Sequence, residues 1–299
     1  LLAALAAARA ARRGLPFRLV TAADAAAEAA LAPGVPVHGC KDLSEVGALL
    51  SGALRHEPDS KTPFSSFTVP RSPEPPAPRL DEVRGQAHAR HALVLTALGG
   101  HALWLRGPPG TGKSMLARRL PGLLEDLAPQ RALELAQIEA ILGPVRSLPR
   151  RPPFRAPHVS ASAQALLGGG TPLRPGEISR AHGGVLFLDE LPEFARPVLE
   201  GLRQPLEEGE VRLQRAREWA RFPAEIQLIA ASNPCPCGFL GHPRVPCRCG
   251  AAVLQRYRAR VSGPLQDRFD LFVEVGPVAP ESLEGPPAEP RDESIHARL

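Results

Sequence analysis

Residues 107–114 read Gly-Pro-Pro-Gly-Thr-Gly-Lys-Ser, which is a complete G-x-x-x-x-G-K-S phosphate-binding loop. The apolar stretch 102–105 precedes the loop and a helix-forming run, 115–120, follows it, so the strand–loop–helix context that the motif needs is present. Pro108 and Pro109 lack an N–H group, so the backbone donors begin at Gly110, where glycines let successive amides turn toward a phosphate. The motif predicts an α/β nucleotide-binding domain.

The residues of this loop have separate expected tasks, with ATP and Mg²⁺ as the cofactors. Lys113 is expected to meet the β- and γ-phosphates, and Ser114 the Mg²⁺. Only three of the 36 basic residues are lysines, and one of them stands where a compact ammonium is needed. The predicted nucleotide-binding residues of the loop are Gly107, Gly110, Thr111, Gly112, Lys113 and Ser114.

Two adjacent carboxylates, Asp189 and Glu190, follow a predicted buried strand at 185–188. In phosphate-loop enzymes the first carboxylate at such a strand end holds Mg²⁺. A second carboxylate beside the metal can polarise the water that attacks the γ-phosphate. We therefore assign Asp189 and Ser114 to Mg²⁺ and Glu190 to the water, with a solvated Asp-Glu pair as the alternative.

Asn233 and Arg268 follow later in the chain. Asn233 comes soon after the apolar run 226–231, so its amide is expected at the same sheet edge, in reach of a γ-phosphate and of the attacking water; the alternative is a turn-forming Asn before a proline. Arg268 is either an arginine finger that acts on a neighbouring subunit, or a structural arginine paired with Asp267 or Asp270.

From residue 80 onward, predicted helices alternate with short, nearly continuous apolar runs, which is typical of a parallel sheet covered on both faces. Residues 211–214 are predicted to form a hairpin that turns back at Phe222. The other predicted strands are 102–105, 185–188, 226–231 and 271–275, and the predicted helices are 86–98, 115–124, 131–142 and 196–202.

The first part of the chain is predicted to be a short β-α-β-α segment, with strands at 17–20 and 35–38 and helices at 22–31 and from Asp42. A helix is also expected before residue 14. Residues 56–79 are rich in Pro and Ser, so a linker is predicted there. The only methionine is Met115, and we expect the sequence to begin inside a domain.

The composition limits the cellular location and the partners that we expect. No apolar span reaches 18 residues, so no membrane partner is expected. Five cysteines in a chain of 299 residues indicate a reducing, cytoplasmic location. The net charge of +5 permits an anionic partner without requiring one.

Four of the cysteines lie close together in the sequence. As thiolates they could bind Zn²⁺ in a closed site that fastens the segment after Asn233. The C-x-C spacing is tighter than the usual C-x₂₋₄-C, so free buried thiols are the alternative, and disulfides are disfavoured. His242 is expected to be a loop residue and Cys40 a small core residue. The candidate zinc ligands are Cys235, Cys237, Cys247 and Cys249.

With these elements in this order, the chain resembles the AAA+ ATPases, and more narrowly their magnesium-chelatase-like branch, the YifB/ComM family. The most specific match is Asn-Pro-Cys-Pro-Cys-Gly at 233–238. One departure is Val159, which stands where the family usually has a second His. The other stretches that carry the resemblance are Val-Arg-Gly-Gln at 83–86, Arg-Ala-Pro-His at 155–158, and residues 175–179, 188–194 and 262–265.

The resemblance implies a domain organisation. Residues 1–55 are similar to the end of a Lon-like, S5-domain-2-like α+β domain, and the linker 56–79 follows. Residues 80–276 form the AAA+ core, a phosphate-loop NTPase sheet with flanking helices. Residues 277–299 begin a truncated C-terminal lid, most of which is expected to be missing. No Ser-Lys pair can be placed in residues 1–55, so peptidase activity is not supported.

The resemblance also implies a function: an ATP-driven ring, expected to be a hexamer, that acts on single- or double-stranded DNA. ComM is associated with DNA branch migration during natural transformation. In such a ring the hairpin would lie near the central pore, where Arg212, Arg215, Arg217 and Arg221 could neutralise phosphates; a solvated charged face is the alternative. A magnesium-chelatase-type subunit that drives metal insertion through a partner, and a slow ATP-dependent regulator or scaffold, are the competing functions.

Overall fold

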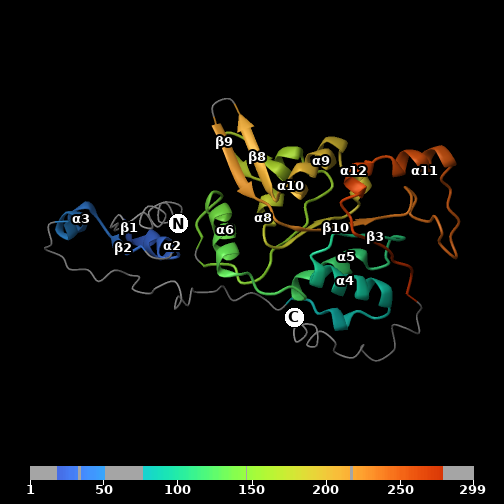
Figure 1. The fold of residues 1–299 in the computed structure, drawn as a ribbon, viewed down its shortest axis with the longest axis horizontal. Coiled ribbons are helices and arrows are strands. Elements are labelled where there is room, and N and C mark those ends of the chain that lie inside the picture. Colours follow the sequence, from blue (N-terminus) through green and yellow to red (C-terminus); the bar gives the residue numbers. More distant parts are fainter. Residues whose placement is uncertain (1–18, 33–34, 51–76, 146, 216–217, 279–299) are drawn as a thin grey trace. The chain divides into compact units, whose positions relative to one another are not determined.

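The structure is a computed structural model that describes residues 19–32, 35–50, 77–145, 147–215 and 218–278 (Figure 1). These residues form two compact units, one of residues 19–50 and 128–150, the other of residues 77–127 and 151–278. The predictions for the helix before residue 14, for most of the linker and the lid, and for Arg217 lie outside the described residues.

The larger unit is built on a five-stranded sheet with the order β11-β3-β10-β7-β4, and every neighbouring pair is parallel. The predicted parallel α/β sheet is therefore confirmed. Strand β4 was missed, because it has only two residues and follows two prolines. The strands are β3 (Leu103–Arg106), β4 (Phe154–Arg155), β7 (Val185–Leu188), β10 (Gln227–Ser232) and β11 (Leu271–Glu274).

Alternate residues of the central strands enter two cores, one on each face of the sheet. Leu105 and Phe187 pack in the core that includes helices α4 (Ala87–Gly99) and α5 (Lys113–Ala117). Leu186 and Leu188 pack in the second core, whose helices are α7 (Ala163–Leu167), α8 (Glu177–Arg180), α9 (Arg196–Gly201) and α12 (Gly263–Gln266). Because both faces are covered, β7 is an unbroken apolar run.

Smaller elements connect these layers. The 3₁₀ turns are η3 (Leu80–Glu82), η4 (Leu120–Gly122) and η5 (Leu191–Glu193), and two further helices are α10 (Arg203–Glu208) and α11 (Ala251–Arg258). Strands β5 (Gly168–Gly169) and β6 (Arg174–Pro175) form a small antiparallel pair. The predicted hairpin is present as β8 (Glu210–Arg215) and β9 (Glu218–Pro223), with Val211 opposite Phe222, and stands out as the two long orange arrows of Figure 1.

The predicted helix 115–124 is shorter than expected. Helix α5 ends at Ala117, and the 3₁₀ turn η4 takes its place. Pro121 explains the break, because it has no N–H to donate and its ring clashes with the carbonyl four residues earlier in a helix. The other helices predicted for this unit lie within one or two residues of α4 and α9.

In the smaller unit, strands β1 (Leu19–Ala22) and β2 (Val37–Cys40) pair in parallel. The 3₁₀ turn η1 (Ala23–Ala25) and helix α2 (Ala26–Ala29) connect them, α3 (Leu43–Leu50) follows, and α6 (Pro129–Ala140) belongs to the same unit. Asp42 begins α3 as predicted: its carboxylate accepts a hydrogen bond from the Glu45 N–H at 2.9 Å. Cys40 is buried. No helix in the described ranges is long and apolar enough to cross a membrane.

Candidate nucleotide-binding site

The phosphate loop runs from the end of β3 to the start of α5, and its glycines are needed for its shape. Gly110 and Gly112 have φ angles of 77° and 90°, in the left-handed region that favours glycine. A Cβ on Gly107 would lie 2.0 Å from the carbonyl oxygen of Val275. The Thr111 hydroxyl closes the loop by donating to the Pro108 carbonyl at 2.9 Å.

Lys113 lies at the centre of the site and is only 8% exposed. Its ammonium donates to two carbonyls of its own loop, each at 2.8 Å, and to Asn233 Oδ1 at 3.3 Å. Burial lowers the pKa of Lys113, and the carboxylates of Asp189 and Glu190 act in the opposite direction. A buried ammonium of this kind is stabilised by a nearby anion, and a bound phosphate would supply one.

Ser114 and Asp189, which come from separate motifs, meet at the carboxyl end of the sheet. The Ser114 hydroxyl donates to Asp189 Oδ2 at 2.5 Å, and the other oxygen of Asp189 accepts the Glu190 N–H at 3.0 Å. A hydroxyl and a carboxylate oxygen are hard ligands that suit Mg²⁺. The donor set therefore fits the expected metal.

Glu190 is exposed beside this pair and has φ 53°. A non-glycine residue in the left-handed region is destabilised by about 1–2 kcal/mol, and such residues cluster at functional sites. This left-handed conformation turns the chain sharply after β7, at the point where η5 begins.

A pocket of about 380 Å³ joins these parts. It is lined by residues of the phosphate loop and of the ends of β7 and β10: Pro109, Gly110, Gly112, Lys113, Ser114, Met115, Asp189, Glu190, Ser232 and Asn233. The structure thus brings together the predicted Lys113, Ser114, Asp189, Glu190 and Asn233. Thr111 and Gly107 shape the loop without lining the pocket.

Arg268 is not among the residues that line this pocket. Its guanidinium donates to Glu207 of α10, and the two side chains are 40% and 44% exposed. Asp270 instead accepts the Ala102 N–H at 2.8 Å. The partner that we expected for a structural Arg268, Asp267 or Asp270, is therefore not the partner present.

Gln86 is a site residue whose task the sequence did not indicate. It has φ 52°, and its side-chain amide donates to the Thr111 carbonyl at 3.2 Å and to the Gly276 carbonyl at 2.6 Å. It therefore ties the phosphate loop to the segment after β11. No local signal marks a glutamine for this role, although Gln86 ends the stretch 83–86 that carries the family resemblance.

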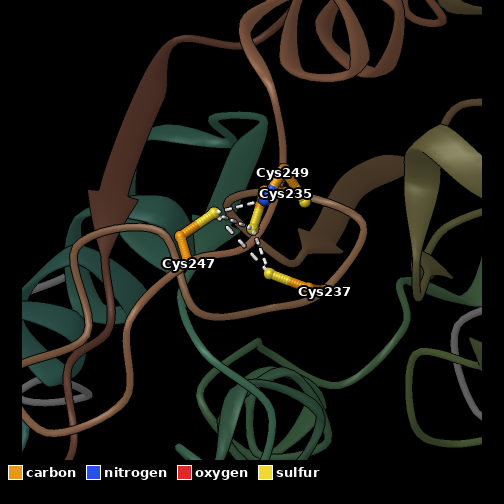
Figure 2. Close-up of side chains that lie close together, drawn as sticks. All are labelled: Cys235, Cys237, Cys247 and Cys249. Atoms are coloured by element: carbon orange, nitrogen blue, oxygen red, sulfur yellow. Dashed lines mark hydrogen bonds between the residues drawn. The ribbon is translucent and has the colours of Figure 1, made fainter.

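The four clustered cysteines lie in the loop between β10 and α11, and their side chains gather in one place (Figure 2). The Sγ distances are 3.4 Å for Cys235–Cys237, 3.7 Å for Cys235–Cys247 and 3.6 Å for Cys237–Cys247. All four sulfurs lie within 4.8 Å of one another. Hydrogen bonds from the backbone of Arg248, and then of Phe239, lower the pKa of Cys237 to about 6.

The hairpin arginines are partly engaged by carboxylates of the same hairpin and of α10. Arg212 and Arg221 both pair with Glu210, and Arg212 also pairs with Glu208. Arg215 is exposed. Trp219, opposite Gln214 in the register, is 75% exposed and was also overlooked.

Comparison with known proteins gives a family match and several similar relatives. A family model described as magnesium chelatase, subunit ChlI, matches residues 79–283. The chain is 45% identical over 270 residues to an uncharacterised protein of Mycobacterium tuberculosis, covering 88% of this chain and 51% of that protein. It is 50% identical over 204 residues to competence protein ComM of Haemophilus influenzae, covering 68% of this chain and 40% of that protein, and 49% identical over 207 residues to YifB of Escherichia coli, with the same coverage.

The chain spans about half the length, or less, of these curated relatives. Among solved structures, a complex between the BchI and BchD subunits of magnesium chelatase matches with a TM-score of 0.50 and 22% identity, over 75% of this chain and 74% of the other. At that identity the match concerns the fold alone.

Proposed function

The chain belongs to the magnesium-chelatase-like YifB/ComM family of AAA+ ATPases, and from this membership we propose that it is the ATP-hydrolysing part of a ring motor that acts on DNA. The observation that carries the proposal is the pocket in which Lys113, the Ser114–Asp189 pair, Glu190 and Asn233 meet. These groups match what phosphoryl transfer to water requires.

In the proposed mechanism the phosphate loop binds the nucleotide through backbone N–H groups from Gly110 onward. Lys113 neutralises charge on the β- and γ-phosphates, and Ser114 and Asp189 would hold Mg²⁺. When bound, Mg²⁺ neutralises the charge that develops on the phosphate oxygens. Because Asn233 Oδ1 already accepts from Lys113 at 3.3 Å, its amide N–H₂ is left to donate to a γ-phosphate oxygen.

Glu190 is proposed to orient and deprotonate the attacking water. It lies next to Asp189 in the chain but does not share the Ser114 contact, so its carboxylate is available beside the metal ligands. A positioned general base contributes roughly 10²–10⁴-fold to a rate.

A ring is the proposed working assembly, with six subunits and with Arg268 acting on the neighbouring subunit's nucleotide. The exposed position of Arg268, outside its own subunit's pocket, supports this role. We also propose a cytoplasmic location, because five cysteines in a chain of 299 residues are typical of a reducing compartment.

The proposed DNA partner rests on the hairpin β8–β9 and on the word competence in the name of the Haemophilus relative. The hairpin presents an exposed arginine, Arg215, and an exposed aromatic ring, Trp219. Arginine neutralises backbone phosphates, and aromatic rings stack on unpaired bases. The chain's net charge of +5 is compatible with an anionic partner.

Two substitutions test the assigned chemistry. We expect Lys113→Ala to weaken ATP binding by at least about 1.5–3 kcal/mol, the worth of a hydrogen bond to a charged group. Glu190→Gln should keep ATP bound and slow its hydrolysis by about 10²-fold or more. Nucleotide affinity and steady-state ATPase rate distinguish them; equal loss of binding in both variants would remove Glu190 from the water-activating role.

The DNA part is tested separately by measuring the ATPase rate and the DNA affinity of the protein with single- and double-stranded DNA. Binding that weakens with salt and stimulates hydrolysis is the expected result. ATPase activity with no DNA binding would support the ATPase part of the proposal, refute the DNA part and favour the chelatase-type alternative.

A further inference from the structure

The loop between β10 and α11 has almost no core of its own. Between Asn233 and Gly250 only Cys235 and Gly238 are buried, and this stretch contains no helix or strand. A segment with so little apolar burial needs another constraint to keep one conformation.

The sulfur geometry indicates what that constraint is. Zn–S bonds of about 2.3 Å in a tetrahedron place the sulfurs about 3.8 Å apart. Three of the sulfur–sulfur distances in the structure are 3.4, 3.6 and 3.7 Å, close to that value and far beyond the roughly 2.05 Å of a disulfide. Four sulfurs and no other ligand type make a closed site, which is the structural rather than the catalytic kind.

Backbone amides are aimed at the same sulfurs. The Leu240 N–H donates to Cys235 Sγ at 3.3 Å, and the Cys249 N–H donates to Cys247 Sγ at 3.4 Å. Hydrogen bonds to a thiolate stabilise its charge, and such outer contacts orient metal ligands.

The cluster is next to the nucleotide pocket in two ways. Asn233, which lines the pocket, is two residues before Cys235, and its carbonyl accepts the Tyr257 hydroxyl at 3.3 Å. Gly238, with φ +84°, lies so close to the phosphate loop that a Cβ there would be 2.7 Å from Pro109 Cδ. The cysteine loop therefore touches the phosphate loop directly.

We propose that Cys235, Cys237, Cys247 and Cys249 hold one zinc ion, and that this ion fixes the loop that positions Asn233 and supports Pro109. Soft thiolates in a tetrahedral set select Zn²⁺ or an iron–sulfur cluster; the proposal commits to zinc. Its second half rests on the ATPase function proposed above.

Metal content tests the first half. Elemental analysis of the purified protein should find about one zinc ion per chain, and Cys247→Ser should lose it. Cys40→Ser is the matched control, because Cys40 is buried in the other unit, and it should keep the metal. Replacing zinc by cobalt in the unaltered protein should give the visible absorption of a tetrahedral thiolate site, so the result does not depend on Cys247→Ser folding. A metal-free protein with reactive thiols, or iron in place of zinc, would overturn the proposal.

Two glycine substitutions test the second half. Gly238→Ala forces a Cβ against Pro109, whereas Gly241→Ala, at nearly the same φ of +79°, meets nothing within 4 Å. The backbone strain is thus similar and only the contact differs. We expect both variants to keep zinc and similar melting temperatures, and Gly238→Ala alone to lower kcat by about 10- to 100-fold, the effect of a displacement of about 1 Å near a reacting centre.

Chelation provides the measurement that does not depend on a variant. Removing zinc from the unaltered protein should lower kcat by a similar factor, and adding zinc should restore it. Equal ATPase rates in the two glycine variants, or an unchanged rate after zinc removal, would refute the positioning role. If the unaltered protein hydrolyses no ATP at all, the proposed function fails instead, while zinc content still decides the metal site.

Discussion

Arg268 offers the most decisive test. As one half of an exposed ion pair it would contribute little to stability, whereas as an arginine finger it would contribute much more to lowering the activation free energy of hydrolysis. Its ion pair with Glu207 joins side chains that are 40% and 44% exposed. Pairs with this exposure stabilise a protein by about 0–1 kcal/mol. An arginine finger contributes about 10³-fold or more to hydrolysis, which corresponds to about 4 kcal/mol.

We therefore expect Arg268→Ala to lower the unfolding free energy by no more than about 1 kcal/mol and to keep ATP affinity nearly unchanged. Its hydrolysis rate should fall by about 10³-fold or more. Glu207→Gln is the matched control, since it breaks the same ion pair and leaves the guanidinium in place; its ATPase rate should stay close to that of the unaltered protein.

Three measurements compare the variants: thermal melting, nucleotide affinity and steady-state ATPase rate. A mixing experiment then tests action between subunits. Arg268→Ala subunits retain a nucleotide site, and Lys113→Ala subunits retain the finger, so mixed rings should recover part of the activity. Equal losses of activity in Arg268→Ala and Glu207→Gln, or no recovery at any mixing ratio, would refute the finger.

Three further predictions concern the hairpin and the core. Trp219→Ala should weaken single-stranded DNA binding by about 1–3 kcal/mol in an anisotropy titration, whereas Trp219→Phe should keep most of the affinity. Equal affinities of Trp219→Ala and the unaltered protein would exclude base stacking. Arg215→Ala should reduce the slope of log affinity against log salt by about 1, and an unchanged slope would place Arg215 away from the phosphates. Gly176→Ala should lower the unfolding free energy by about 1–3 kcal/mol, because its Cβ would lie 2.4 Å from the Gly168 N; Gly263→Ala, with open space, is the control for the melting experiment.

Much of the fold could be predicted because its signals are local. A strand covered on both faces must be apolar at every position, so the limits of β7 were predicted to the residue. The limits of α5 were not, because a phosphate-loop helix was extended through Pro121. The two-residue strand β4 carries too few side chains to show any period, and only its pairing with β7 makes it a strand.

The sequence by itself determined the phosphate loop, the class of the sheet and the types of residue at its carboxyl edge, since each depends on neighbours in the chain. Only the tertiary structure decided which of these residues meet. Ser114 contacts Asp189, which lies 75 positions away in the chain. Arg268 pairs with Glu207, 61 positions away, and not with the aspartates close to it in the sequence. Strand order fixes the first contact. Exposed ion pairs differ by less than about 1 kcal/mol, so no sequence rule selects between them. The approach of Gly238 to Pro109 likewise depends on how the loop after β10 folds back over the sheet edge, a path that local propensities do not encode.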